Sequence, residues 1–231
     1  QAGPPRPAVR LISHNQRMIV TRLGHACLLV ESPSTRILID PGSFSATWHE
    51  LPDLDAILLT HQHPDHFDAD NVEAVIGANP EVRVIVEPAV AKMLGEQSPH
   101  AALVGEIVDL GSVTVEVVGG QHAVVHDRIP AVGNVGYIIR ESGGPTLFHP
   151  GDSYDVTPSG IDLLALPFVA PWAKTAMTID FANSVTPERA IPIHDVFINE
   201  IGRSTWMRIC RGVIDETIAI DDPALGDPYT V

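Results

Sequence analysis

From Met18 onward, the chain consists of short apolar runs that are bounded by Gly, Pro, Ser and Asp. Runs of this kind, rich in Val, Ile and Leu, predict β-strands. The predicted strands are 18–23, 26–32, 35–40, 56–60, 82–87, 112–120, 134–140, 146–149, 161–167 and 189–194, and the predicted helices are 70–78, 88–96, 178–185 and 204–210. Strands and helices alternate in both halves. This pattern is typical of a layered α/β protein in which two sheets pack face to face with helices outside.

The two ends of the chain differ from the rest. Residues 1–17 are rich in Pro, Arg and Gly and show neither strand nor helix periodicity. We expect them to be an N-terminal extension or a remnant of cloning that does not take part in the fold. Residues 18–231 are expected to form a single domain, a common size for one α/β unit. The last segment, 221–231, is acidic and contains prolines, so we expect it to be held loosely.

Composition and charge limit the partners that the protein can have. Of the 231 residues, 45% are hydrophobic and 19% are charged, which is typical of a globular protein. The formal net charge of −15 repels phosphate backbones and anionic lipid, so we expect a small-molecule substrate, no nucleic acid and no membrane surface. The charge leaves open whether the protein is a homo-oligomer. No signal-like apolar core precedes Met18, and two cysteines form no disulfide framework, which favours the cytoplasm.

The strongest chemical signal is the segment Thr-His-Gln-His-Pro-Asp-His at 60–66, which directly follows a buried strand. Alternate side chains of an extended segment lie on the same side, so His61 and His63 can offer imidazoles to one cation. The proline then turns the chain, which places Asp65 and His66 where they can serve a second cation. Imidazoles with a carboxylate suit Zn, Fe or Mn. The alternative is a polar surface loop, although four such groups behind a buried strand are hard to satisfy without a metal.

Further ligand-type residues follow other predicted strands. His122 comes after the strand at 112–120, His149 and Asp152 lie at and just beyond the end of another strand, and His194 ends a third. Taken singly, each of these residues is more often an ordinary polar group than a ligand. Together they share one position, the end of a strand, and strand ends that converge on one rim build active sites in α/β proteins.

In chain order, a His-x-His-x-Asp-His motif is thus followed by a lone His, a Gly-Asp pair and a final His. This order resembles the metallo-β-lactamase superfamily of metal-dependent hydrolases, over essentially the whole chain from Met18. It looks most like the branch that contains ascorbate-6-phosphate lactonase and N-acyl-phosphatidylethanolamine phospholipase D, where a Gly-His pair and an Ile-Asp-Pro segment come first. Here these are Gly24-His25 and Ile39-Asp40-Pro41. The resemblance implies a four-layer αββα sandwich, the metallo-β-lactamase fold.

The resemblance also implies a role for each ligand-type residue and a reaction. Two divalent cations, zinc first and manganese or iron as alternatives, would activate a hydroxide that attacks a small ester, lactone, thioester or phosphodiester. A carboxylate suits the bridge between two cations because it offers two oxygens. The implied ligands are His61, His63 and His122 for the first metal, Asp65, His66 and His194 for the second, and Asp152 as the bridge.

Three departures from better-known members narrow the chemistry. Asp152 stands where the antibiotic-hydrolysing members have Cys, and His66 stands where they have Arg or Cys, which disfavours β-lactam hydrolysis. His63 stands where the di-iron flavoprotein oxidoreductases have Glu, which argues against redox chemistry. His126 lies four residues past His122 and competes with it for the metal. We assign the metal to His122, which follows its strand more closely, and expect His126 to face the substrate as a catalytic residue.

The remaining candidates each carry two interpretations. Asp65 is a second candidate for catalysis, since it could orient the hydroxide or accept its proton. His25 and His149 would line the cleft and donate a proton to the leaving group, or else bond a neighbouring loop. Asp40 would hydrogen-bond a ligand histidine from behind or only make the turn before Pro41. Trp172 would form a wall of the pocket or pack in the core or at an oligomer contact.

Two other functions compete with a small-molecule hydrolase. Ribonucleases and phosphodiesterases of the same superfamily share the seven ligand positions, but the acidic charge and the lack of a Lys/Arg-rich arm argue against a nuclease. A non-catalytic metal-binding protein is the second alternative, since members of large superfamilies can keep a fold and lose its chemistry. Every expected ligand position is filled here, which argues against this alternative.

Overall fold

The computed structural model describes residues 18–45, 47–97 and 99–231, so the expected extension at 1–17 lies outside the described residues. Within them the strands form two sheets. The first sheet has the order β14-β1-β2-β3-β4-β5-β6 and contains β1 (Ile19–Gly24), β2 (Cys27–Ser32), β3 (Thr35–Ile39), β4 (Ala56–Leu59), β5 (Arg83–Val86), β6 (His100–Ala101) and β14 (Pro228–Thr230).

The second sheet repeats this plan. Its order is β13-β12-β11-β10-β9-β8-β7, and it contains β7 (Ile107–Asp109), β8 (Val113–Gly119), β9 (Val135–Glu141), β10 (Thr146–His149), β11 (Leu163–Pro167), β12 (Arg189–Ile193) and β13 (Ala219–Ile220). In each sheet the strands of one half pair antiparallel and those of the other half pair parallel. The parallel halves direct the carboxyl ends of neighbouring strands toward one edge, where ligands bind in α/β proteins.

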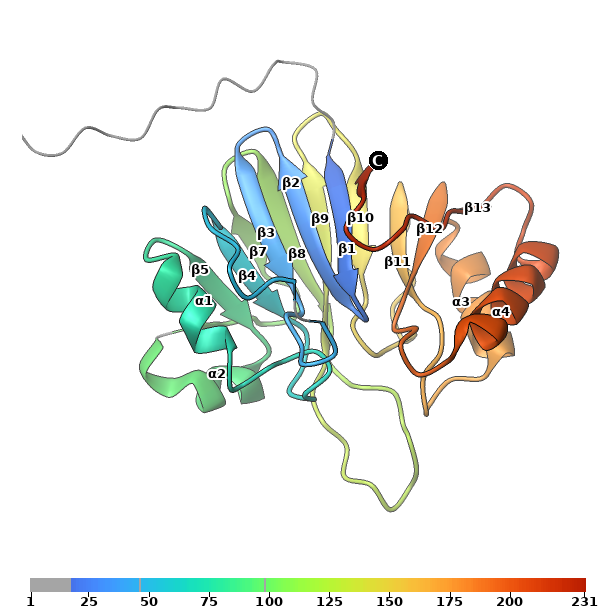
Figure 1. Cartoon of the computed structure of the whole chain (residues 1–231), viewed down its shortest axis with the longest axis horizontal. Helices are drawn as coiled ribbons and strands as arrows, with labels where there is room; N and C mark the ends of the chain where they lie inside the picture. Colours follow the sequence, from blue (N-terminus) through green and yellow to red (C-terminus); the bar gives the residue numbers. More distant parts are fainter. Residues whose placement is uncertain (1–17, 46, 98) are drawn as a thin grey trace, which may run out of the picture.

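Helices cover the outer face of each sheet, as Figure 1 shows. Side chains such as Leu28 and Val115 fill an inner core between the sheets. A second core packs the first sheet against α1 (Val72–Ala78) and α2 (Pro88–Leu94), which continues into a short 3-10 turn (Gly95–Gln97). A third core packs the second sheet against α3 (Thr175–Val185) and α4 (Glu200–Val213). The predicted αββα sandwich is therefore confirmed. Among the described helices, none is both long and apolar enough to cross a bilayer.

The structure contains every predicted strand and helix but corrects the expectation for the C-terminus. Residues 228–230 form β14, which pairs antiparallel with β1, and the backbone N–H of Val231 donates to Met18 O at 3.0 Å. The tail is therefore bound to the sheet rather than loosely held. The strands that the pattern missed, including β14, are two- or three-residue edge strands. Backbone pairing at an edge needs no apolar run, so hydrophobicity does not mark these strands.

Candidate metal centre

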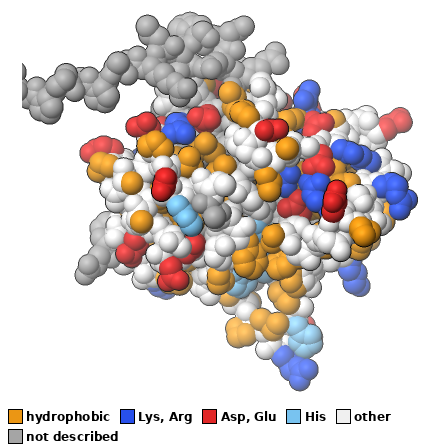
Figure 2. Space-filling model, viewed as in Figure 1, with side chains coloured by type: hydrophobic (Ala, Val, Ile, Leu, Met, Phe, Trp, Pro, Cys, Tyr) orange, Lys and Arg blue, Asp and Glu red, His pale blue; other side chains and the backbone are white. Residues whose placement is uncertain are grey.

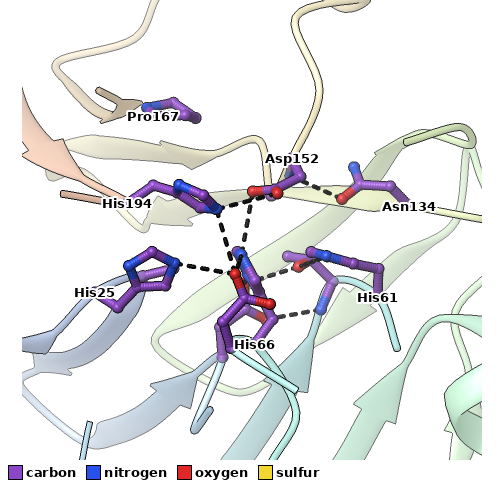
Figure 3. Close-up of polar contacts among 12 residues, drawn as sticks. His25, His61, His66, Asn134, Asp152, Pro167 and His194 are labelled. Carbon is purple, nitrogen blue, oxygen red and sulfur yellow. Dashed lines mark hydrogen bonds and ion pairs between the residues drawn. The ribbon is translucent and has the colours of Figure 1, made fainter. Parts of the chain in front are cut away.

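Six strand ends deliver polar side chains to one edge of the sandwich. His25 follows β1, Asp40 follows β3, and the histidine-rich segment 60–66 follows β4. His122, Asp152 and His194 follow β8, β10 and β12, respectively. Figure 3 shows His25, His66, Asp152 and His194 pointing toward one another from different strands, with His61 beside them. Residues that are far apart in the sequence thus meet at one site.

The potential ligand atoms fall into overlapping groups, within each of which all atoms lie within 4.8 Å of one another. One group contains His61, His63 and His122, and another contains His25, Asp65, His66 and His194. A third group, His61, His66 and Asp152, overlaps both. The structure therefore brings together all seven residues that the sequence predicted as metal ligands. Their division between two metals stays a prediction.

Asp152 lies between the two groups. Its Oδ2 atom is 3.3 Å from His122 Nε2 and 3.1 Å from His194 Nε2, and its Oδ1 atom is 3.1 Å from His66 Nε2. Each oxygen of one carboxylate thus faces an imidazole, and the imidazoles come from both groups. This is the position that a bridging carboxylate requires.

The hydrogen bonds of the imidazoles show which ring nitrogen faces the site. The Nδ1 atoms of His66, His122 and His194 lie 2.6–2.7 Å from the Asp40 carboxylate, Ala123 O and Val169 O, respectively. These oxygens only accept, so Nδ1 must donate a proton in each ring, which leaves Nε2 as the nitrogen that faces the site. The Nε2 atoms are buried and have no hydrogen-bond partner, and the same holds for His61 Nε2 and Asp152 Oδ1.

Asp40 connects to histidines of both candidate ligand groups. Its Oδ2 atom accepts from His66 Nδ1 at 2.7 Å and from the Thr60 hydroxyl at 2.7 Å. Because this hydroxyl donates to Asp40, its oxygen is free to accept from His61 Nδ1 at 3.0 Å. Asp40 also makes the turn before Pro41, where its backbone O accepts from Gly42 N–H. It therefore matches both interpretations that the sequence left open.

The carboxylates dominate the electrostatics of the site. Burial alone would lower the pKa of His194, but the carboxylates of Asp152 and Asp65 outweigh it and raise the pKa to about 9. Burial is likewise outweighed at His66, where Asp152 and Asp40 hold the pKa well above its ordinary value. In contrast, burial and the nearby His66 hold the pKa of His61 well below its ordinary value. The site therefore attracts positive charge, which protons supply when no metal is bound.

Two glycines allow the loops of the site to approach closely. A Cβ at Gly42 would lie 1.9 Å from the backbone O of Asp65, so only glycine lets the loop after β3 contact the histidine-rich segment. Gly151 has a φ of +62°, and a Cβ there would lie 2.3 Å from Asn134 Oδ1. Among the described residues, His25, Asp40 and His194 also have positive φ, which is strained for side chains of this size. Strain of this kind typically concentrates at functional sites.

Two other predicted site residues, His149 and His126, lie outside the ligand groups. His149 lies within 2.9 Å of Ala26 O through Nε2 and accepts from Gly151 N–H at Nδ1, so both nitrogens contact backbone. These contacts match the loop-bonding alternative, and the catalytic role of His149 stays a prediction. His126 is exposed and accepts from Arg128 N–H, outside the ligand groups. Its catalytic role stays a prediction.

Trp172 and His25 each contact a carboxylate of the site. Trp172 donates its Nε1–H to Asp152 Oδ2 at 2.9 Å, which adds a polar contact to the wall role that we expected. His25 Nε2 lies 3.2 Å from Asp65 Oδ2 and is buried. Since a carboxylate only accepts, His25 donates and orients Asp65.

Two residues that support the site were not predicted. Thr60 carries the contact between His61 and Asp40, and Asn134 Oδ1 accepts from the backbone N–H of Asp152 at 2.9 Å. Thr60 precedes the histidine motif, and Asn134 precedes β9. Polar residues are common at strand ends, so the sequence contained no signal that would have distinguished these two.

The chain has two sheets packed face to face between helices, and its histidines and aspartates gather at one edge. This fold and site are those of the metallo-β-lactamase-fold class of proteins. The family model described as the beta-lactamase superfamily domain (Lactamase_B_3) matches residues 19–194. This match covers most of the chain, and the chain therefore belongs to the β-lactamase superfamily.

Relatives resemble the chain in sequence, and a solved structure resembles it in fold. Protein Rv0786c of Mycobacterium tuberculosis is 41% identical over 190 residues, which cover 82% of this chain and 89% of that protein. A UPF0173 metal-dependent hydrolase of Xanthobacter autotrophicus is 32% identical over 151 residues, which cover 59% of this chain and 62% of that protein. Igni18, a metallo hydrolase from Ignicoccus hospitalis, has a similar fold, with a TM-score of 0.70, 17% identity and coverage of 93% of this chain and 98% of that chain.

Proposed function

We propose that the protein is a hydrolase that uses two divalent metal ions. The residues of the site would divide between them as the sequence predicted. One ion would be held by His61, His63 and His122, the other by Asp65, His66 and His194, and both by Asp152. Imidazole and carboxylate ligands fit zinc, with manganese or iron as alternatives. Similarity to proteins described as metal-dependent or metallo hydrolases supports the proposal of a metal site.

One observation carries the proposal, namely that buried polar atoms without hydrogen-bond partners face one another in the centre of the site. The Nε2 atom of His66 and the Oδ1 atom of Asp152 are both buried, have no partner and lie 3.1 Å apart. The Nε2 atoms of His122 and His194, also without a partner, face the other oxygen of Asp152. Atoms of these types at this distance need a positive charge between them, which a metal ion supplies when bound and protons supply otherwise. The donor set therefore fits a metal centre.

The proposed reaction is the attack of water on an acyl or phosphoryl group. When bound, a pair of cations lowers the pKa of a shared water and polarises the substrate oxygen. Asp65 is the partly exposed carboxylate of the site, and its contact with His25 fixes its orientation. We assign to Asp65 Oδ2 the acceptance of the proton that water loses. His25, the neighbour of this oxygen, acts as a positioning residue.

Small esters, lactones, thioesters and phosphodiesters all remain in the proposed substrate class. The alternative within the superfamily is a ribonuclease or phosphodiesterase, and the net charge of −15 is unfavourable for a long anionic polymer. The alternative outside catalysis is a metal-binding protein without turnover. The two alternatives differ from the main proposal in what the metal-loaded protein hydrolyses.

The proposal is tested by stripping the protein with a chelator, reloading it with Zn²⁺, Mn²⁺ or Fe²⁺, and assaying four small substrates and a structured RNA. The four substrates are p-nitrophenyl acetate, γ-butyrolactone, an acetyl thioester and bis(p-nitrophenyl) phosphate. We expect the metal-loaded protein to hydrolyse at least one of them. The rate should fall by about a thousandfold in the stripped protein and recover on reloading.

Other outcomes would assign another function. Cleavage of RNA that falls steeply with added salt would favour the nuclease. Full metal loading without turnover of any substrate would favour the non-catalytic protein. Hydrolysis that is equally fast in the stripped protein would contradict a metal-dependent mechanism.

A further inference from the structure

The loop that joins β8 to β9 is unusually apolar for an exposed segment. It projects from the edge of the sandwich that carries the site (Figure 1). Val124 is 70% exposed, Ile129 is 54% exposed and Val125 is 38% exposed. Figure 2 shows hydrophobic side chains gathered on the projecting part of the molecule and on the surface next to it. Aliphatic side chains are not normally clustered in water without a use.

A small pocket lies between this loop and the candidate metal centre. Its volume is about 70 Å³, and its lining includes His63, His122, Val125, Ile129, Pro130 and Val132. Two of these residues, His63 and His122, belong to the same ligand group. Apolar side chains and two candidate ligands of the proposed first metal therefore line the same pocket.

Backbone hydrogen bonds hold the loop against the site. The N–H of His122 donates to Val132 O at 3.1 Å, and the N–H of Gly120 donates to Asn134 O at 2.7 Å. The N–H of Ala123 donates to the backbone O of Asp152 at 2.8 Å. Both strands of the loop base are thus tied together and to the turn that carries the proposed bridge. These contacts place the base of the loop, and the pocket beside it, next to the candidate metal ligands.

We propose that this pocket binds a short, uncharged aliphatic arm of the substrate. This inference rests on the proposed function and narrows its substrate class to short-chain acyl esters, thioesters or lactones. A group attacked beside His122 would have its acyl chain within reach of Val125 and Ile129. Among the residues that the structure describes, no lysine or arginine lines the pocket, so it offers no partner for a phosphate.

The size of the pocket sets the length of the chain that it accepts. The volume of about 70 Å³ leaves room for a short aliphatic chain and not for a long one. Burying each methylene group is expected to strengthen binding about fourfold. Affinity should therefore rise with chain length and then level off.

This expectation is tested with straight-chain hydroxamic acids, which chelate metal ions and bind whether or not the protein turns over an ester. Acetohydroxamic, butyrohydroxamic, hexanohydroxamic and octanohydroxamic acids would be titrated into the zinc-loaded protein by calorimetry. We expect butyrohydroxamic acid to bind about fifteenfold more tightly than acetohydroxamic acid, because it buries two more methylene groups, and the longer acids to add little.

Two matched variants locate the effect. Val125→Asn places a polar group in the pocket, and we expect it to reduce the fifteenfold ratio to below about threefold. Val213→Asn makes the same change at an exposed residue of α4, outside the pocket, and should keep the full ratio. Metal content and thermal melting, measured for both variants, show whether either has lost its fold.

The outcomes separate this inference from the proposed function. Equal affinities across the series, or a ratio that Val125→Asn leaves unchanged, would overturn the pocket while the metal centre stands. If the protein cannot be loaded with zinc, the metal centre is absent, and the proposed function and the pocket fall together. An affinity that keeps rising through octanohydroxamic acid would contradict the short-chain limit.

Discussion

Asp152→Asn is expected to abolish measurable hydrolysis and to remove at least one of two metal ions per chain. Asp152 contacts imidazoles of both ligand groups, and the amide of asparagine offers only one neutral oxygen in place of two charged ones. Losing the electrostatic stabilisation by one metal ion costs about 4 kcal/mol, which corresponds to about a thousandfold in rate. The measurements are metal content by mass spectrometry and the rate on the best small substrate.

Asp155→Asn is the matched control for this change. Asp155 lies three residues further along the same loop and is exposed, and its carboxylate belongs to no ligand group. It should keep wild-type metal content and rate. If Asp152→Asn retained both metal ions, Asp152 would not be the bridge.

Asp40→Asn is expected to weaken metal binding and to destabilise the metal-free protein, although Asp40 belongs to no ligand group. Its Oδ2 atom accepts from both His66 and Thr60, and an amide nitrogen at that position would face two donors. Each unsatisfied buried polar group costs about 1–3 kcal/mol. Loss of an orienting partner of this kind typically weakens metal affinity by about 10–100-fold. Asparagine tolerates the left-handed backbone at this position, so the turn itself is kept.

Urea unfolding of the metal-free protein and zinc titration measure the two effects separately. Asp55→Asn is the control. Asp55 is exposed and directly precedes β4, at the opposite end of the strand from the histidine motif. Wild-type zinc affinity in Asp40→Asn would show that the contacts of Asp40 with His66 and Thr60 do not support the ligands.

Hydrophobic patterning predicted the strands and helices of a layered α/β protein because the strands are buried and bounded by turns, whereas the αββα sandwich came from the family resemblance. The segment 56–60, for example, became β4, whose residues are all buried. The edge strands escaped prediction because their stability comes from backbone pairing. Tyr229 in β14 pairs with Val20 in β1, yet its neighbours in the sequence are polar or proline. The longer-range pairing of the C-terminus with the first strand cannot be inferred from local pattern.

The candidate site was predictable to the extent that its residues shared a motif. The spacing of His61 and His63 placed both on one side of an extended segment, and both lie in one ligand group. The position of a residue at a strand end does not tell which way its side chain points. His149 ends β10, yet its ring bonds Ala26 O instead of facing the cluster. Thr60 and Asn134 could not be predicted as part of the site, because their contacts with its residues form only when the chain folds.

The count of metal ions per chain tests the central claim most directly. The wild-type protein, stripped and reloaded with zinc and then freed of excess metal, would be analysed by mass spectrometry against protein concentration. The two groups of candidate ligands, with Asp152 between them, predict two zinc ions per chain. A protein that stays metal-free after reloading, with its fold intact, would contradict the claim that these side chains form a metal centre.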